Sequence, residues 1–179
     1  MQIYTGITGD PRKLAQIRDY GLGIMISSHP GVSIPKDLSG IPCALDNGAF
    51  SAWQNDYPFD EYAFLKTMSK CRVKKINLDF IACPDIVAGG QRSLNFSLMW
   101  RKRLTIDNIA LVVQDGMEPK HTVNCNYAQF SHIFIGGTPD WKWATAAEWV
   151  NQAHVMGMKC HIGQCGTVDR LRRAKELGA

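Results

Sequence analysis

Short apolar runs in this sequence end repeatedly on polar or glycine residues that could do chemistry together. A single residue of this kind after a strand indicates only a turn, because turn-forming residues are common there. Its repetition across several loops indicates a shared pocket instead. The residues are Asp46 of LDNGAF, Asp79 and Asp85 of LDFIACPD, Gln114 and Asp115 of VVQDGM, Gly136 and Gly137 of IGGTPD, and Gln164 of IGQCG.

The types of these residues favour recognition of a purine and chemistry at a sugar. A carboxylate can accept two parallel hydrogen bonds from the N1–H and exocyclic amine of guanine, while backbone N–H groups beside glycine can meet O6. A second carboxylate can act as acid, base or nucleophile at an anomeric carbon. The sequence has no serine elbow, P-loop or histidine beside a nucleophile, which disfavours acyl and phosphoryl transfer.

The elements that must position these residues alternate along the chain. Regular spacing, polar strand ends and the lack of a GxGxxG motif favour an α/β fold of the (β/α)8 barrel type over a doubly wound open sheet. Seven strands are visible, so we expect the eighth to lie beyond the end of the chain or another element to cover the gap. The strand-like runs are QIYTGI, LGIMIS, IPCAL, INLDFI, IALVVQ, HIFIGG and KCHIGQ.

Helix boundaries can be predicted from capping residues. Asp10, before a proline, is the expected N-cap of a first helix. Thr145 and Glu148 form the pattern of a capping box, and Gly157 is expected to end the helix that this box begins. Thr167 is expected to begin the last helix.

The bulk composition is that of one soluble domain, residues 1–179. Hydrophobic residues make up 45% and charged residues 20%, and no segment offers the ~20 uncharged apolar residues of a membrane span. The start, MQIYTGITGDPRK, lacks the pattern of a signal peptide, which predicts a cytoplasmic protein.

The six cysteines are scattered, so in a reducing compartment we expect free thiols with a structural role. They are Cys43, Cys71, Cys83, Cys125, Cys160 and Cys165. Cys160, His161 and Cys165 come nearest to a metal site, but Cys160 and His161 would face opposite ways on a strand. We therefore expect no metal.

Positive charge is concentrated in three runs, WRKR (residues 100–103), VKK (73–75) and DRLRRAK (169–175). The net charge of +4 permits an anionic partner, but each run by itself is most simply a solvated helix face. The segment DWKW (140–143) interleaves aromatic rings with a cation, as channels for polynucleotides do. It could equally fix the entry to a helix, and both interpretations stay open.

The motifs LDNGAF, LDFIACPD, VVQDGM, FIGGTPD and HIGQCGTVDRLRRAKELGA, in this order, resemble the strand-end motifs of the tRNA-guanine transglycosylase superfamily. The DNGAF form is most similar to the DNA-modifying relatives, which insert 7-deazaguanines into DNA. The resemblance covers residues 45–179. It implies a (β/α)8 barrel that exchanges guanine in a polynucleotide for a free 7-deazaguanine base through a covalent glycosyl-enzyme intermediate, without a cofactor.

The resemblance also implies roles for individual residues. Asp46 would contact the base and assist proton transfer, and Asp79 would hold the guanine edge. Gln114 would help to read the base, and the backbone at Gly136 and Gly137 would close on it. These residues are expected to meet around one hollow.

Two further assignments concern the wall of the pocket and the phosphate. Phe50, or Trp53, is expected to shape the wall, although core packing behind a turn would also explain these rings. Gly163, Gly166 and Thr167 lie in the loop that matches the one after the family's seventh strand. A glycine-rich loop before a helix suits a phosphate, because its N–H groups and the helix dipole point outward.

The sequence departs from the family pattern in two ways. The family's nucleophilic aspartate lies on the eighth strand, directly after the ELGA at which this sequence stops, so no residue here is assigned that role. The cysteine zinc site of tRNA-acting members is missing, which favours DNA over tRNA. A helper protein or a homodimer is a possible partner. The alternatives are a nucleic-acid or nucleobase binding module without turnover, and a barrel enzyme for a small phosphorylated substrate.

Overall fold

The structure, a computed structural model, describes residues 1–122 and 129–179. In these residues seven strands alternate with helices along the chain, and the strand pairs within each part are parallel. This confirms the predicted α/β class. The chain divides into two compact units, Gln2–Ile81 and Ala82–Ala179, and the second also includes Met1.

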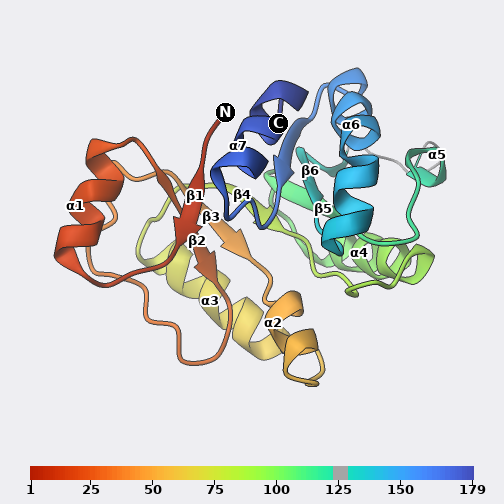
Figure 1. Cartoon of the computed structure of the whole chain (residues 1–179). Helices are drawn as coiled ribbons and strands as arrows, with labels where there is room; N and C mark the ends of the chain where they lie inside the picture. The colour runs from red at the N-terminus through yellow and green to blue at the C-terminus, as the bar shows by residue number, and fades with distance from the viewer. Residues whose placement is uncertain (123–128) are drawn as a thin grey trace. The chain divides into compact units, whose positions relative to one another are not determined.

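The Gln2–Ile81 unit holds a parallel sheet in which strands neighbour one another in chain order (Figure 1, red to yellow). Its strands are β1 (Tyr4–Gly6), β2 (Gly23–Ser27), β3 (Cys43–Asp46) and β4 (Leu78–Ala82). Its helices are α1 (Pro11–Asp19), α2 (Ala49–Gln54) and α3 (Glu61–Val73). Ile24, Ile26, Ala44 and Leu45 are fully buried, so β2 and β3 form the centre of the core.

The first helix begins where the sequence predicts. The Asp10 side chain accepts a hydrogen bond from the Arg12 N–H at 2.9 Å, which satisfies one of the backbone donors at the helix start. Leu14 and Ile17, one turn apart, are the buried residues of α1. The N-cap prediction at Asp10 is therefore confirmed.

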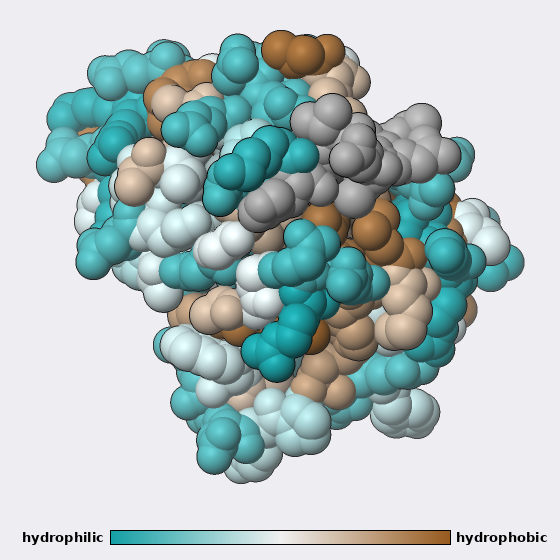
Figure 2. Space-filling model, turned by 90° about the vertical axis from the view of Figure 1, so that its right-hand side faces the viewer, coloured by the Kyte–Doolittle hydropathy of each residue, from teal (hydrophilic) through white to brown (hydrophobic). Residues whose placement is uncertain are grey.

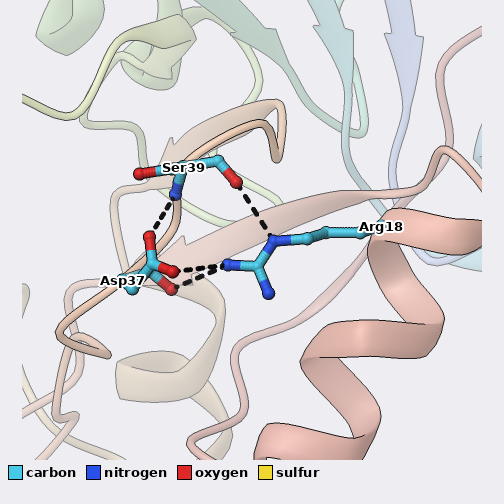
Figure 3. Close-up of polar contacts among 3 residues, drawn as sticks. All are labelled: Arg18, Asp37 and Ser39. Atoms are coloured by element: carbon cyan, nitrogen blue, oxygen red, sulfur yellow. Dashed lines mark hydrogen bonds and ion pairs between the residues drawn. The ribbon is translucent and has the colours of Figure 1, made fainter.

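The loop between β2 and β3 is attached to α1 by one arginine (Figure 3). Arg18 Nε donates to the Ser39 carbonyl oxygen at 3.1 Å, and a terminal nitrogen of the same side chain lies 3.1 Å from Asp37 Oδ2. The Ser39 N–H donates to the other Asp37 oxygen at 2.8 Å. Hydrogen bonds from Ser39, with a smaller contribution from Arg18, lower the pKa of Asp37.

The Ala82–Ala179 unit holds a second set of parallel strands with helices between them (Figure 1, green to blue). Its strands are β5 (Ile109–Val113), β6 (His132–Ile135) and β7 (Lys159–Ile162), with β6 in the middle. Its helices are α4 (Gln91–Arg103), α5 (Pro119–Thr122), α6 (Pro139–Val155) and α7 (Val168–Leu177). The residues of β5 are all buried, as expected of a parallel strand covered on both faces.

The start of helix α6 differs from the sequence prediction. It begins at Pro139 and not at the predicted capping box, so Thr145 lies inside the helix. The Thr145 hydroxyl donates to the Trp141 carbonyl oxygen at 2.9 Å, which is a back-bond within the helix and not a cap. The predicted end is confirmed, because Gly157 follows the helix with φ +68°.

The surface mixes hydrophilic and hydrophobic side chains, as the face in Figure 2 shows. The exposed large hydrophobic residues of the Ala82–Ala179 unit include Met99 and Val155. Within the residues that the structure describes, no helix has both the length and the apolar composition needed to cross a membrane. The described cysteines are free thiols, as predicted, and Cys125 lies outside the described residues.

Candidate functional site

The carboxyl ends of β5, β6 and β7 lie level with one another. The last residues of these strands pair across the sheet, Val113 with Ile135 and Ile135 with Ile162. The ladder continues one residue further, because the N–H groups of Gly136 and Gly163 donate to the strands beside them. Gln114, Gly136 and Gly163 therefore follow the strands side by side on the same face, as the sequence analysis expected of these loops.

A buried carboxylate and a buried carboxamide meet at this edge. Gln114 Nε2 donates to Asp85 Oδ2 at 2.6 Å, and each residue is only 4% exposed. The Ala88 N–H points at the amide oxygen of Gln114 from 3.4 Å. The planes of the Gln114 amide and the Asp85 carboxylate are thus held by a short bond in a region from which water is mostly excluded.

Two serines of α4 position Asp85. The Ser97 hydroxyl donates to the Pro84 carbonyl oxygen at 2.9 Å, and the Ser93 hydroxyl accepts from the Ile86 N–H at 3.1 Å. These bonds fix the backbone on both sides of Asp85. Both serines are fully buried and stand one turn apart on the helix, so they tie the loop after β4 to α4.

Gly136 is required for the position of the Gln114 side chain. A Cβ atom at this position would lie 2.7 Å from Gln114 Nε2 and 3.2 Å from Val112 Cγ1. Real side chains do not approach so closely, so the amide of Gln114 can lie over the backbone of Gly136 only because no side chain is there.

The neighbouring loop is fixed by a second carboxylate, Asp115. One Asp115 oxygen accepts from the Thr138 N–H at 2.8 Å and the other from the Thr138 hydroxyl at 2.5 Å. Gly137 has φ +76°, and a Cβ there would lie 2.6 Å from both Asp115 Oδ2 and the Trp141 ring. Asp115 and Gly137 thus shape the loop that follows the Gln114–Gly136 contact.

Lys142 is buried, which contradicts the interpretation of DWKW as a polynucleotide channel. The residue is 2% exposed, and its ammonium group donates to the Gly163 carbonyl oxygen at 2.9 Å. Burial lowers the pKa of Lys142, and the charge of Arg170 acts in the same direction. This cation holds the end of β7 against α6 and cannot meet a polymer at the surface.

The predicted phosphate loop has the expected helix start. The Thr167 hydroxyl accepts from the Arg170 N–H at 3.3 Å, so the predicted start of α7 is confirmed. Gly166 has open space on the side where a Cβ would stand, whereas the carbonyl oxygen of Gly163 is engaged by Lys142. Phosphate binding by Gly163, Gly166 and Thr167 stays a prediction.

Asp46 ends β3 in the Gln2–Ile81 unit, as predicted. Its Oδ2 accepts from the Gly48 N–H at 3.1 Å, and Gly48 has φ +82° where the chain turns into α2. Burial raises the pKa of Asp46, although the N–H groups of Gly48 and Asn47 act in the opposite direction. Folding therefore disfavours the ionised form of this carboxyl group.

Phe50 lies on α2, directly after this turn, and its ring centre is 5.9 Å from that of Trp53. Phe50 is partly buried and Trp53 is 53% exposed. The two rings form a tilted pair next to Asp46 in sequence. Their predicted role as a pocket wall stays a prediction.

We expect replacement of Asp46 by asparagine to raise Tm at pH 7 by a few degrees. A carboxyl group whose pKa is raised by folding stabilises the fold only while it is protonated. This contribution is lost as the pH rises above the pKa that the group has in the unfolded chain. Asparagine keeps an acceptor for Gly48 without the buried charge. Thermal unfolding followed by circular dichroism measures the effect. Below pH 3 the two proteins should converge, and Asp107→Asn, at an exposed position, should show no comparable gain.

Asp79 does not lie at the end of a strand, contrary to the expectation. It is the second residue of β4, and the register shifts here, since Cys43 pairs with Leu78 and Ala44 with Phe80. Asp79 is thus the extra residue of a β-bulge. Its Oδ2 accepts from the Tyr4 hydroxyl at 2.6 Å, and the burial of Tyr4, together with this contact, raises the pKa of the tyrosine.

The structure therefore brings together part of the predicted site. Gln114, Gly136 and Gly137 meet in the Ala82–Ala179 unit, whereas Asp46, Phe50 and Asp79 belong to the Gln2–Ile81 unit. The residue that sequence reasoning left without a role is Asp85. The sequence features that could have identified it are Pro84 and Asp85 shortly after the end of β4, followed by two serines four residues apart, Ser93 and Ser97.

Comparison with known proteins adds no assignment: no protein family, no curated protein and no solved structure matches the chain. Among the described residues there is also no group of three or more histidine, cysteine or acidic side chains that could hold a metal ion.

Proposed function

We propose that the protein is a guanine transglycosylase that exchanges guanine in DNA for a free 7-deazaguanine base. The observation that carries this proposal is the bond between Gln114 and Asp85 over the bare backbone of Gly136. This contact joins a carboxylate and a carboxamide beside the level ends of β5, β6 and β7. As part of the proposal, the strands of the chain belong to a (β/α)8 barrel with its site at this edge.

The chemistry of guanine matches these groups. Its N1–H and exocyclic amine can donate together to one carboxylate, and its O6 can accept from an amide or backbone N–H. Adenine has no N1–H and no amine at C2, so it lacks the donors that Asp85 would accept. We assign the guanine edge to Asp85, because Asp85 and not Asp79 contacts Gln114.

The exchange is redox neutral and needs no cofactor. The glycosidic bond from C1′ to N9 of guanine breaks, and the departing base takes up a proton. The incoming base loses its N9 proton when the new bond from C1′ forms. The resemblance assigns the transfer of these protons to Asp46. The covalent intermediate requires a nucleophile, which the resemblance assigns to an aspartate beyond residue 179.

Base recognition can be tested separately from turnover. We expect isothermal titration calorimetry to show binding of guanine and 7-deazaguanine, with adenine weaker by about tenfold or more. Asp85→Asn should weaken guanine binding about 10- to 100-fold, the range expected for hydrogen bonds to a charged group. Transfer of labelled 7-deazaguanine into a guanine-containing DNA oligonucleotide then measures the exchange itself.

Asp79→Asn is the matched control, because it makes the same chemical change at the other candidate carboxylate. A loss of binding in Asp79→Asn but not in Asp85→Asn would contradict our assignment. Because no residue of 1–179 is assigned as the nucleophile, guanine binding without exchange would favour a binding module only if a chain that also carries the expected eighth strand fails to exchange. Binding of a sugar phosphate but of no base would point to a barrel enzyme for a small phosphorylated substrate.

A further inference from the structure

The three basic runs of the sequence differ in what the structure does with their charges. In WRKR, Arg101 donates to backbone carbonyl groups, and the guanidinium of Arg103 lies 4.1 Å from the centre of the Trp100 ring. In DRLRRAK, Arg173 donates to the Trp143 carbonyl oxygen at 2.8 Å and lies 5.0 Å from the centre of its ring. Much of the charge of these two runs therefore has a structural use.

The third run, VKK, continues a basic face of α3. Lys66, Lys70 and Lys74 follow one another at intervals of four residues and are all exposed. Successive ammonium groups are therefore about 6 Å apart along the helix axis. Among the residues that the structure describes, none of the three has a carboxylate partner. Lys70 lies in the last turn of α3, where its charge also interacts favourably with the helix dipole. Lys66 lies before the last turn, so the helix dipole does not explain its position.

The chain around this helix face is strongly basic. The segment 62–77 contains five basic residues and no aspartate or glutamate. A hollow of about 250 Å³ adjoins the end of α3, and its lining includes Lys36, Lys74 and Lys75. The carboxylate in its lining, Asp37, is already paired with Arg18 (Figure 3). The charge of the surface is therefore complementary to a polyanion.

The same helix face also offers an aromatic ring and apolar surface. Tyr62 is 71% exposed, and Lys66 Nζ lies 5.3 Å from the centre of its ring. An open hollow of about 500 Å³ runs beside the lysines and is lined by Tyr62, Leu65 and Val73, with mostly apolar surface. Alternating lysines with an exposed ring are what proteins use to hold a single strand of nucleic acid, with the phosphates on the cations and a base on the ring.

We propose that the exposed face of α3, formed by Tyr62, Lys66, Lys70, Val73 and Lys74, binds single-stranded nucleic acid. A phosphodiester chain running along the helix meets one ammonium group per turn, and a base stacks on Tyr62 over the apolar hollow. None of these residues is among those proposed to recognise guanine. It does not depend on base exchange, because the backbone and the stacking face are common to all nucleotides.

The test uses a strand without guanine, so that its outcome is independent of the proposed function. Fluorescence anisotropy of a labelled oligothymidylate of about 12 nucleotides measures the affinity of the full chain. Combined Lys66→Gln, Lys70→Gln and Lys74→Gln should weaken binding about tenfold or more at low salt. It should also reduce the slope of log K against log salt by about 2, because each phosphate contact on a single strand contributes about 0.7. Tyr62→Ala should weaken binding about fivefold or more.

The matched control changes the same number of charges elsewhere. Lys102→Gln, Lys159→Gln and Lys175→Gln together remove three exposed lysines of the other unit and should leave the affinity nearly unchanged. An equal loss in both triple variants would show that only net charge matters and would overturn the proposal. So would the absence of binding to the wild type, or competition by polyglutamate as strong as that by the oligonucleotide, which would identify an acidic protein as the occupant. Thermal unfolding checks that each variant is folded.

Discussion

Replacing Gly137 by alanine should lower the free energy of unfolding by about 3 kcal/mol, combining the left-handed backbone with overpacking. The backbone here has φ +76°, where a residue with a Cβ is strained. The added Cβ would also lie 2.6 Å from both Asp115 Oδ2 and the Trp141 ring. The ring belongs to α6 and Asp115 holds Thr138, so neither can move without disturbing the loop. Denaturant unfolding followed by circular dichroism measures the loss.

Two glycine variants serve as controls for this prediction. Gly9→Ala adds a Cβ that would meet nothing within 4 Å and should be nearly neutral. Gly136→Ala adds a Cβ 2.7 Å from Gln114 Nε2, the end of a side chain that can turn away. It should therefore destabilise less than Gly137→Ala but displace the amide and weaken guanine binding. Equal stability of all three variants would contradict the loop geometry described for Gly137.

The parts of the fold that could be predicted are those set by local rules. The caps at Asp10 and Thr167 were predictable because a short polar side chain there satisfies backbone donors of its own helix. The level ends of β5, β6 and β7 follow from parallel pairing, so the meeting of Gln114 with Gly136 could be expected from sequence. The first inference is purely local, and the second needs only the parallel pairing that the alternation of strands and helices predicts.

The errors arose where a contact distant in sequence decides the outcome. The capping box at Thr145 is a genuine local pattern, but Thr138 and Pro139 begin the helix two turns earlier and take Thr145 into its interior. Asp79 lies in an apolar run whose end the sequence does not mark, and pairing with β3 carries β4 on past Asp79 to Phe80 and Ile81, with a register shift at Asp79. No periodicity in the sequence records such a shift.

Asp85 and Lys142 show the same limitation at the candidate site. Sequence patterns place charged residues at the surface unless a partner is known, because a buried charge without a partner is unfavourable. The partners here are Gln114 for Asp85 and the Gly163 carbonyl for Lys142, 29 and 21 residues away. The burial of these two charges could be recognised only when the loops were seen together.

The stability of the protein should fall as the pH is lowered from 6.5 towards 4, with His161 contributing up to about 3 kcal/mol of the loss. Burial lowers the pKa of His161 to about 4, and the charges of His132 and Lys142 act in the same direction. The centre of the His161 ring lies 4.9 Å from the centre of the Phe134 ring on the neighbouring strand β6. In this pH range the unfolded chain binds a proton that the folded chain excludes. The contribution is therefore complete above pH 6.5 and is lost as the pH falls to the folded pKa.

His161→Gln isolates this contribution, because glutamine is polar but does not titrate. The substitution should destabilise at pH 7 through lost packing, and the gap between wild type and variant should narrow as the pH falls to 4. Chemical denaturation at a series of pH values measures the gap. His154→Gln, at an exposed position of α6, should keep the wild-type pH dependence. Parallel curves for wild type and His161→Gln would mean that His161 takes up its proton as readily in the folded protein as in the unfolded chain, and water would then have to reach its ring beside Phe134.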